Sequence, residues 1–150
     1  MKDARITIEF ITHCLASGRQ EKNGYDEFEK DNDGNIIWRQ AWWYSALMKA
    51  IELSDIKNIK AAHFHFSPVV TAATEIFKRK YGRDKFRTHE AIMPGTVVTF
   101  EAVVDAAVTE SVASAVLDRM GKYIGLSPYG YNLGYGKFKV VKVEVDPSVK

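Results

Sequence analysis

The stretch that decides the fold, residues 125–136, reads GLSPYGYNLGYG and joins two segments with regular patterns. It holds four glycines, one proline and three tyrosines. Glycine permits positive φ angles and close approach by another chain, and tyrosine offers a flat face that can hydrogen-bond. A helical pattern precedes the stretch and a valine-rich strand pattern, residues 137–145, follows it. We therefore interpret it as a loop that shapes the chain and also contacts a ligand.

Two segments have the apolar periodicity of amphipathic helices. Residues 40–53 form the clearer one, with Trp43, Leu47 and Ala50 on its stripe. Thr109 is placed to cap the second helix, which runs up to the glycine-rich loop. Gly121 is expected to weaken or end the last turn of this helix.

Four segments are expected to be strands: residues 5–11, 60–66, 96–104 and 137–145. The first and third alternate strictly between apolar and polar positions, as a half-buried strand does. The apolar phase of the last one changes between Val140 and Val141, which predicts either a β-bulge or burial on both faces. Residues 69–77 fit either a strand or a short helix.

The predicted order is β–α–β, a basic excursion, and β–α–β. This order predicts an α+β protein with the ferredoxin-like βαββαβ fold: a four-stranded antiparallel sheet with two helices on one face. We expect one such domain over residues 1–150, with an acidic flap at about residues 19–39 and a basic hairpin at about residues 75–92. Within the flap, DNDGN at residues 31–35 predicts a plain turn rather than a calcium loop.

Composition fits a globular protein, with 46% hydrophobic and 27% charged residues. The chain has no apolar run long enough to cross a bilayer, and we expect no membrane partner and no signal peptide. Its single cysteine, Cys14, fits a reducing and therefore cytoplasmic setting. The net charge is only +2, so an argument for nucleic acid must rest on where the charges lie.

The charges are concentrated in residues 78–87, where six of ten residues are lysine or arginine. Such a segment can neutralise phosphates, and its aromatic residues can stack on bases. Gly82 predicts the tip of a hairpin. The expected ligand-binding residues here are Lys78, Arg79, Lys80, Tyr81, Arg83, Lys85, Phe86 and Arg87.

The loop ends in Gly134-Tyr135-Gly136-Lys137-Phe138 and leads directly into the last predicted strand. In this position the pattern resembles the RAMP superfamily, the ferredoxin-like RNA-binding proteins of CRISPR systems. The resemblance implies a stand-alone, single-domain relative whose glycine-rich loop binds RNA. The loop residues expected to bind are Gly125, Ser127, Tyr129, Gly130, Tyr131, Gly134, Tyr135, Gly136 and Lys137.

The sequence predicts a binding protein more than an enzyme. His13, after the first strand, is the one weak candidate for a catalytic residue, a general acid or base in RNA cleavage without a metal. His63 and His65 are expected on one face of a strand, but no cysteine stands at metal-ligand spacing from them. We therefore expect no metal and no cofactor.

Several functions stay open. The first expectation is non-catalytic binding of RNA or another polyanion. The alternatives are a protein–protein module, phage-encoded or not, that joins or blocks a CRISPR effector complex or its subunits; a metal-free endoribonuclease; and a sponge for a nucleotide signal. In the sponge, Trp42, Trp43 or Tyr131 would stack on the base. A self-associating sheet edge would allow a homo-oligomer.

Overall fold

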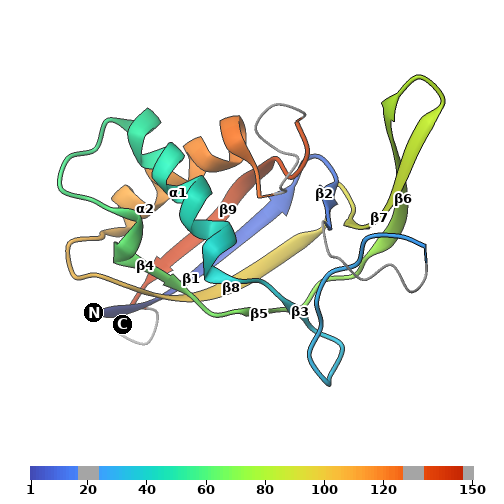
Figure 1. Cartoon of the computed structure of the whole chain (residues 1–150). Helices are drawn as coiled ribbons and strands as arrows, with labels where there is room; N and C mark the ends of the chain where they lie inside the picture. The colour runs from blue at the N-terminus through green and yellow to red at the C-terminus, as the bar shows by residue number, and fades with distance from the viewer. Residues whose placement is uncertain (17–23, 127–133, 147–150) are drawn as a thin grey trace.

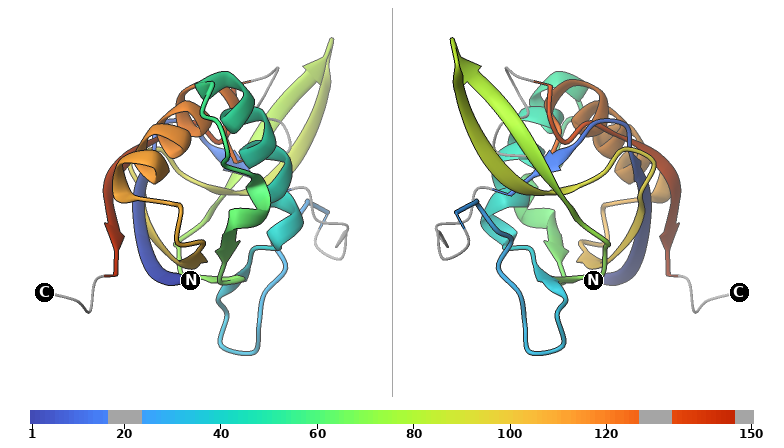
Figure 2. Two further views of the ribbon diagram at one scale, coloured as in Figure 1. Left: turned by 90° about the vertical axis from the view of Figure 1, so that its left-hand side faces the viewer. Right: turned by 90° about the vertical axis from the view of Figure 1, so that its right-hand side faces the viewer.

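A computed structural model of the chain describes residues 1–16, 24–126 and 134–146. Its main sheet has the strand order β4-β8-β1-β9, and all neighbouring strands are antiparallel (Figure 1). The strands are β1 (Lys2–Phe10), β4 (Phe64–Phe66), β8 (Val97–Val104) and β9 (Phe138–Val145). Helices α1 (Gln40–Ser54) and α2 (Glu110–Arg119) cover one face of this sheet (Figure 2). The predicted ferredoxin-like fold is confirmed.

The core forms between the helices and the covered face of the sheet. Ile6, Ile8 and Phe10 of β1 are buried, as the alternation of apolar residues predicts. Trp43 and Leu47 of α1 pack into the same cluster. Because Trp43 is fully buried and stacks on Phe66 with ring centroids 3.7 Å apart, it has no face left for a ligand. The stacking role considered for Trp43 is therefore wrong.

The second helix begins at a side-chain cap and ends in a wider helical turn. The Thr109 side chain accepts a hydrogen bond from the Val112 N–H and caps α2. The α-helix ends at Arg119, and one wider turn, the π-helix η2 (Met120–Ile124), continues it. A Cβ on Gly121 would lie 2.2 Å from the Phe138 carbonyl oxygen, so the glycine lets this turn approach β9. In β9 the register shifts around Val141, which confirms the predicted bulge.

The second predicted strand is shorter than expected. Residues Ala61–His63 form a 3-10 turn, η1, and only Phe64–Phe66 pair as β4. In this turn the His63 N–H donates to the Lys60 carbonyl, and the His63 Nδ1 accepts a hydrogen bond from the Lys60 N–H. The expectation that His63 and His65 share one face of a strand is therefore wrong, and only His65 lies on β4.

The excursion between β4 and β8 is a long hairpin that stands away from the main sheet (Figures 1 and 2). Its strands are β6 (Glu75–Gly82) and β7 (Lys85–Ile92), which confirms the predicted hairpin and its tip. The short strand β2 (Cys14–Leu15) pairs with the base of β7. The ambiguous residues 69–77 divide between β5 (Val69–Val70), which pairs with β3 (Ile36–Ile37), and the start of β6.

The described part of the flap is tied to this hairpin. Asp26 forms a parallel bridge with His89, and Lys30 pairs with Ile36 to close a tight loop. The Asp31 carboxylate accepts hydrogen bonds from the Asp33 and Asn35 N–H groups. The DNDGN segment is therefore a plain turn, as predicted.

Candidate RNA-binding site

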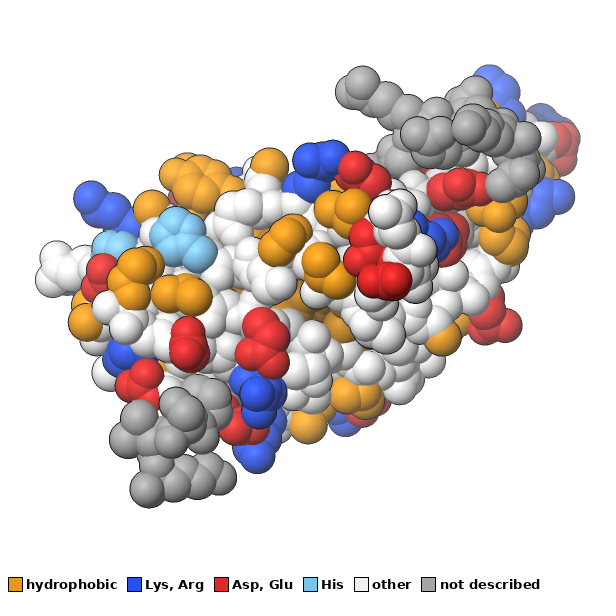
Figure 3. Space-filling view, turned by 90° about the horizontal axis from the view of Figure 1, so that it is seen from below, with side chains coloured by type: hydrophobic (Ala, Val, Ile, Leu, Met, Phe, Trp, Pro, Cys, Tyr) orange, Lys and Arg blue, Asp and Glu red, His pale blue; other side chains and the backbone are white. Residues whose placement is uncertain are grey.

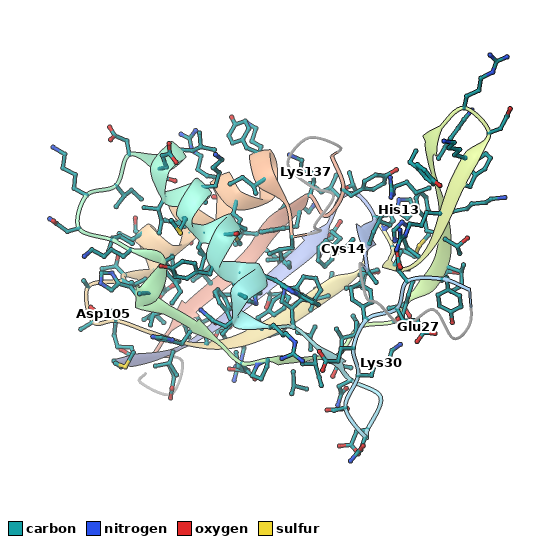
Figure 4. All side chains as sticks on the ribbon, viewed as in Figure 1. His13, Cys14, Glu27, Lys30, Asp105 and Lys137 are labelled. Carbon is teal, nitrogen blue, oxygen red and sulfur yellow. The ribbon has the colours of Figure 1, made fainter. Side chains whose placement is uncertain are left out.

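The candidate site lies at the end of the main sheet where β1 ends. There the Thr12 hydroxyl donates to the Gly134 carbonyl at 2.8 Å and accepts from the Lys137 N–H at 2.9 Å. The Gly136 N–H donates to the His13 carbonyl at 2.7 Å. The end of the glycine-rich loop is thus clamped to the residues that follow β1, and His13 and Lys137 lie at this same end of the sheet (Figure 4).

The glycines at the two ends of the loop have packing roles. Gly125 has φ +84°, and a Cβ there would lie 2.6 Å from the Tyr135 carbonyl oxygen. The Leu126 N–H donates to the Gly136 carbonyl at 3.0 Å, which brings both ends together. Gly134 and Gly136 also have positive φ, so only glycine fits them without strain. The predicted binding residues Ser127, Tyr129, Gly130 and Tyr131 lie outside the described residues.

Three rings join the glycine-rich loop to the basic hairpin. Phe77, at the base of β6, lies with its centroid 4.1 Å from the His13 ring and 5.9 Å from the Tyr135 ring. We call His13, Phe77 and Tyr135 the ring junction. The sequence marks both the loop and the hairpin as candidate binding regions. It does not predict that they meet, and it does not mark Phe77 as a contact between them. The only signal for Phe77 was an aromatic residue directly before the basic run.

One face of the hairpin is an exposed surface of cations and an aromatic ring. Lys80 lies opposite Phe86 in the register, and Lys78 lies two residues before Lys80 on the same face. The Lys78 Nζ is 4.5 Å and the Lys80 Nζ 6.0 Å from the Phe86 ring centroid. We call Lys78, Lys80 and Phe86 the hairpin patch; Arg83 and Lys85 extend its charge to the tip. Lysines held beside an exposed ring can bind a phosphate while the ring stacks on a base.

The other face of the hairpin holds two arginines in an internal network. Arg87 donates to both carboxylate oxygens of buried Asp26, at 2.6 and 2.8 Å. Arg79 is buried and donates from Nε to the His89 Nε2 at 3.2 Å. Arg87 therefore joins the hairpin to the flap, and Arg79 joins β6 to β7 within the hairpin. The positive charge that the sequence shows is thus divided between the hairpin patch and a face whose arginines are paired, with Arg79 buried and Arg87 half exposed.

His89 is the centre of this network. Its side chain is fully buried, and its Nδ1 donates to the Ala16 carbonyl at 2.7 Å and lies 3.2 Å from Asp26. Since Nε2 accepts from Arg79, the ring is the neutral tautomer with the proton on Nδ1. Burial lowers the pKa of His89 and outweighs the opposite effects of the Ala16 carbonyl and Asp26.

A second buried acid fixes the base of the hairpin. Glu90 accepts hydrogen bonds from the Phe28 N–H, from Lys30 at 2.8 Å and from the Thr74 hydroxyl at 2.6 Å. Burial alone would raise the pKa of Glu90, but these donors together lower it. The flap and the hairpin are thus joined by two adjacent networks of hydrogen bonds and charges.

His13 is partly buried beside Phe77, and its neighbour Cys14 is fully buried. Partial burial lowers the pKa of His13, and burial raises the pKa of the neighbouring Cys14 thiol well above its usual range. Within residues 1–16, 24–126 and 134–146, no three His, Cys, Asp or Glu side chains gather as metal ligands do. None of the helices described is long and apolar enough to cross a membrane.

Comparison with known proteins identifies the fold. No model of a known family matches the sequence, and no curated protein matches it. A chain in the cryo-EM structure of the Type III-B Cmr-beta bound to cognate target RNA is similar in structure, with a TM-score of 0.62 and 16% identity. The match covers 96% of this chain and 60% of that one, so this chain spans less than two thirds of its neighbour's length. At this identity the similarity shows that the chain shares its ferredoxin-like fold with part of that chain.

Proposed function

We propose that the protein is a non-catalytic, cytoplasmic module that binds single-stranded RNA through the hairpin patch and the glycine-rich loop. The observation that carries the proposal is the ring junction, because its contacts join the base of the hairpin to the end of the glycine-rich loop, two segments that are far apart in the sequence. The proposed path begins at Lys78, Lys80 and Phe86 on one face of the hairpin and passes around the edge strand β6 to Phe77, which lies on the other face. From Phe77 it continues past Tyr135 to Lys137.

The chemistry of this surface suits a single strand. Lysines that neutralise phosphates release counterions, which supplies affinity without dependence on sequence. Each exposed ring offers a stacking face that every base can use, worth about 1–3 kcal/mol per base. The similarity of fold to a chain of an RNA-bound complex agrees with this proposal.

Reversal of charge on the hairpin patch tests the proposal. The double variant Lys78→Glu, Lys80→Glu should bind a labelled, unphosphorylated 20-nucleotide RNA at least about tenfold more weakly than the parent chain, because two phosphate contacts are lost and replaced by repulsion. The control is Lys57→Glu, Lys142→Glu, which makes the same charge change away from the path and should stay within about twofold of the parent. Fluorescence anisotropy measures both, and equal affinities of the two double variants would contradict the proposal.

The same RNA samples test the enzyme alternative. We expect the RNA to stay full length after long incubation, and His13→Ala to leave that result unchanged. Cleavage that disappears in His13→Ala would instead assign the ribonuclease function.

The fold comparison favours one second candidate, a protein–protein module that takes the place of an effector subunit. The supporting observation is that nearly the whole chain superimposes on part of a chain from the structure of the Type III-B Cmr-beta bound to cognate target RNA. Native mass spectrometry of the protein mixed with purified Type III-B subunits tests this candidate. A stable complex that forms without RNA, and survives the hairpin-patch variant, would favour the module over the RNA-binding protein.

A further inference from the structure

A second basic surface lies on the helical side of the glycine-rich loop, outside the hairpin. It is a groove of about 800 Å³ between η2 and the start of β9. Arg119, Lys122, Lys137 and Lys139 line it, together with Tyr123. We call this surface the η2 groove. Lys137 and Thr12 belong both to its lining and to the clamp on the loop, so the groove continues the proposed RNA path.

The π-helical turn shapes this groove. The close approach of Gly121 to Phe138 sets the floor, because both residues line the groove. The Lys137 Nζ donates to the Lys122 carbonyl at 3.3 Å, which holds its ammonium group at the wall. Single π turns inside α-helices are frequent at functional sites, since they displace side chains from the regular helical path.

The groove combines an exposed ring with cations on either side. Tyr123 is 42% exposed, and its ring centroid lies 5.9 Å from the Arg119 Cζ and 5.3 Å from the Lys122 Nζ. Cations beside a ring of this kind can bind a phosphate next to a stacked base.

The charge of the groove is strongly positive. Asp118 is the one acid among the described residues that line it, against four cations. Of these, Lys139 lies 3.7 Å from Glu9, a weak pair at the margin. Partial burial lowers the pKa of Lys137. A cation that has already lost part of its hydration gains more free energy when it binds an anion, because less water must be displaced.

We propose that the η2 groove binds a phosphomonoester carried by a nucleoside, with the phosphate on Lys122 and Lys137 and the base against Tyr123. This inference rests on the proposed RNA-binding function and deepens it. A phosphomonoester carries about −1.5 to −2 charges near pH 7, more than the single charge of an internal phosphodiester. A groove with four cations at the end of the path therefore favours the phosphorylated end of a strand over its interior. A free mononucleotide offers the same chemistry.

Three RNAs of one sequence, ten nucleotides long, test the inference: one with a 5′-phosphate, one with a 3′-phosphate and one with neither. We expect one of the phosphorylated RNAs to bind about tenfold more tightly than the unphosphorylated RNA. Lys122→Glu should remove this difference, and Tyr123→Ala should reduce it. Lys142→Glu lies on the same strand as Lys139 but outside the groove, and should keep the difference. Thermal unfolding checks that each variant is folded.

Calorimetry with UMP and AMP distinguishes the two sources of the ligand. Binding of a mononucleotide that is lost in Lys122→Glu, with no binding of any RNA, would support the groove and overturn the RNA-binding proposal. Equal affinity for all three RNAs, unchanged by Lys122→Glu and with no mononucleotide bound, would overturn the groove while leaving the hairpin patch in place.

Discussion

At the scale of single residues, the glycines in and near the loop have packing roles that the composition of the loop does not indicate. The clustered glycines are typical of a ligand-binding loop, yet Gly125 is needed because the backbone of Tyr135 and Gly136 passes against it. Gly121, expected only to end a helix, is where η2 meets β9. Both positions are set by long-range packing rather than by local turn geometry.

Gly121→Ala tests this packing. The added methyl group would meet the Phe138 carbonyl oxygen and ring, so either η2 or β9 must move, and we expect unfolding to become easier by about 2–3 kcal/mol. Urea unfolding measures the loss. Gly134→Ala is the control, because nothing lies within 4 Å of a Cβ there and only backbone strain at φ +82° remains, about 1 kcal/mol. A Gly121→Ala protein as stable as the parent would show that η2 does not press on β9.

At the scale of elements, the hairpin is held by buried polar groups rather than by an apolar core of its own. Asp26 and Glu90 are acids of low exposure that face each other's segments. Arg87 of the hairpin donates to Asp26 of the flap, and Lys30 of the flap donates to Glu90 of the hairpin. The Thr74 hydroxyl, just before β6, also donates to Glu90. Figure 4 shows the labelled flap residues Glu27 and Lys30 below the hairpin base. A buried charge is costly unless it is paired, so the flap and hairpin should keep their relative position as one unit.

The contact between the flap and the hairpin should weaken in mild acid. The folded pKa of His89 lies below its unfolded value of about 6.5, so the unfolded chain binds more protons as the pH falls through that value. Stability should therefore be full above about pH 6.5 and should decline as the pH falls toward the folded pKa. Urea unfolding at pH 7.5 and 5.5 measures the decline.

The control is the same measurement in His13→Asn, since His13 also has a lowered pKa. We expect a decline to remain in that variant, and titration of the His89 ring by NMR should show a midpoint below 6.5. A midpoint above 6.5, or greater stability at pH 5.5, would contradict the assignment of a neutral, buried ring.

At the scale of the whole molecule, the cations that suit RNA gather at one end of the fold rather than on the open face of the sheet. Seen from below, acidic, basic and hydrophobic side chains are interspersed (Figure 3). On that face Arg5 pairs with Glu101, and the Thr7 and Thr99 hydroxyls hydrogen-bond. The proposed RNA path therefore crosses the end of the sheet, from the hairpin patch to the η2 groove.

The salt dependence of RNA binding should report the length of this path. About four phosphate contacts would give a slope near −3 for the logarithm of the binding constant against the logarithm of salt concentration, at about 0.7 per contact for a single strand. Lys78→Gln should reduce the slope by about 0.7, whereas Lys57→Gln, in the loop after α1, should leave it unchanged. Affinity that does not respond to salt would rule out a path built on phosphate contacts.

The order of elements, the hairpin and its tip, the Thr109 cap and the bulge near Val141 could all be predicted from the sequence. Each depends on a local period or on a residue's preference for one backbone geometry. The sequence also indicated a basic segment and a glycine-rich loop as candidate binding regions, because composition alone marks them.

Only the tertiary structure decided which charges face outward and which segments meet. Asp26 and Arg87 are 61 positions apart, and Thr12 and Gly134 are 122 apart. No local pattern encodes such contacts, because they follow from strand order, register and the angle at which the hairpin leaves the sheet. For the same reason Arg79 and Arg87 read like Lys78 and Lys80 in the sequence, but Arg79 is buried against His89 and Arg87 pairs with buried Asp26.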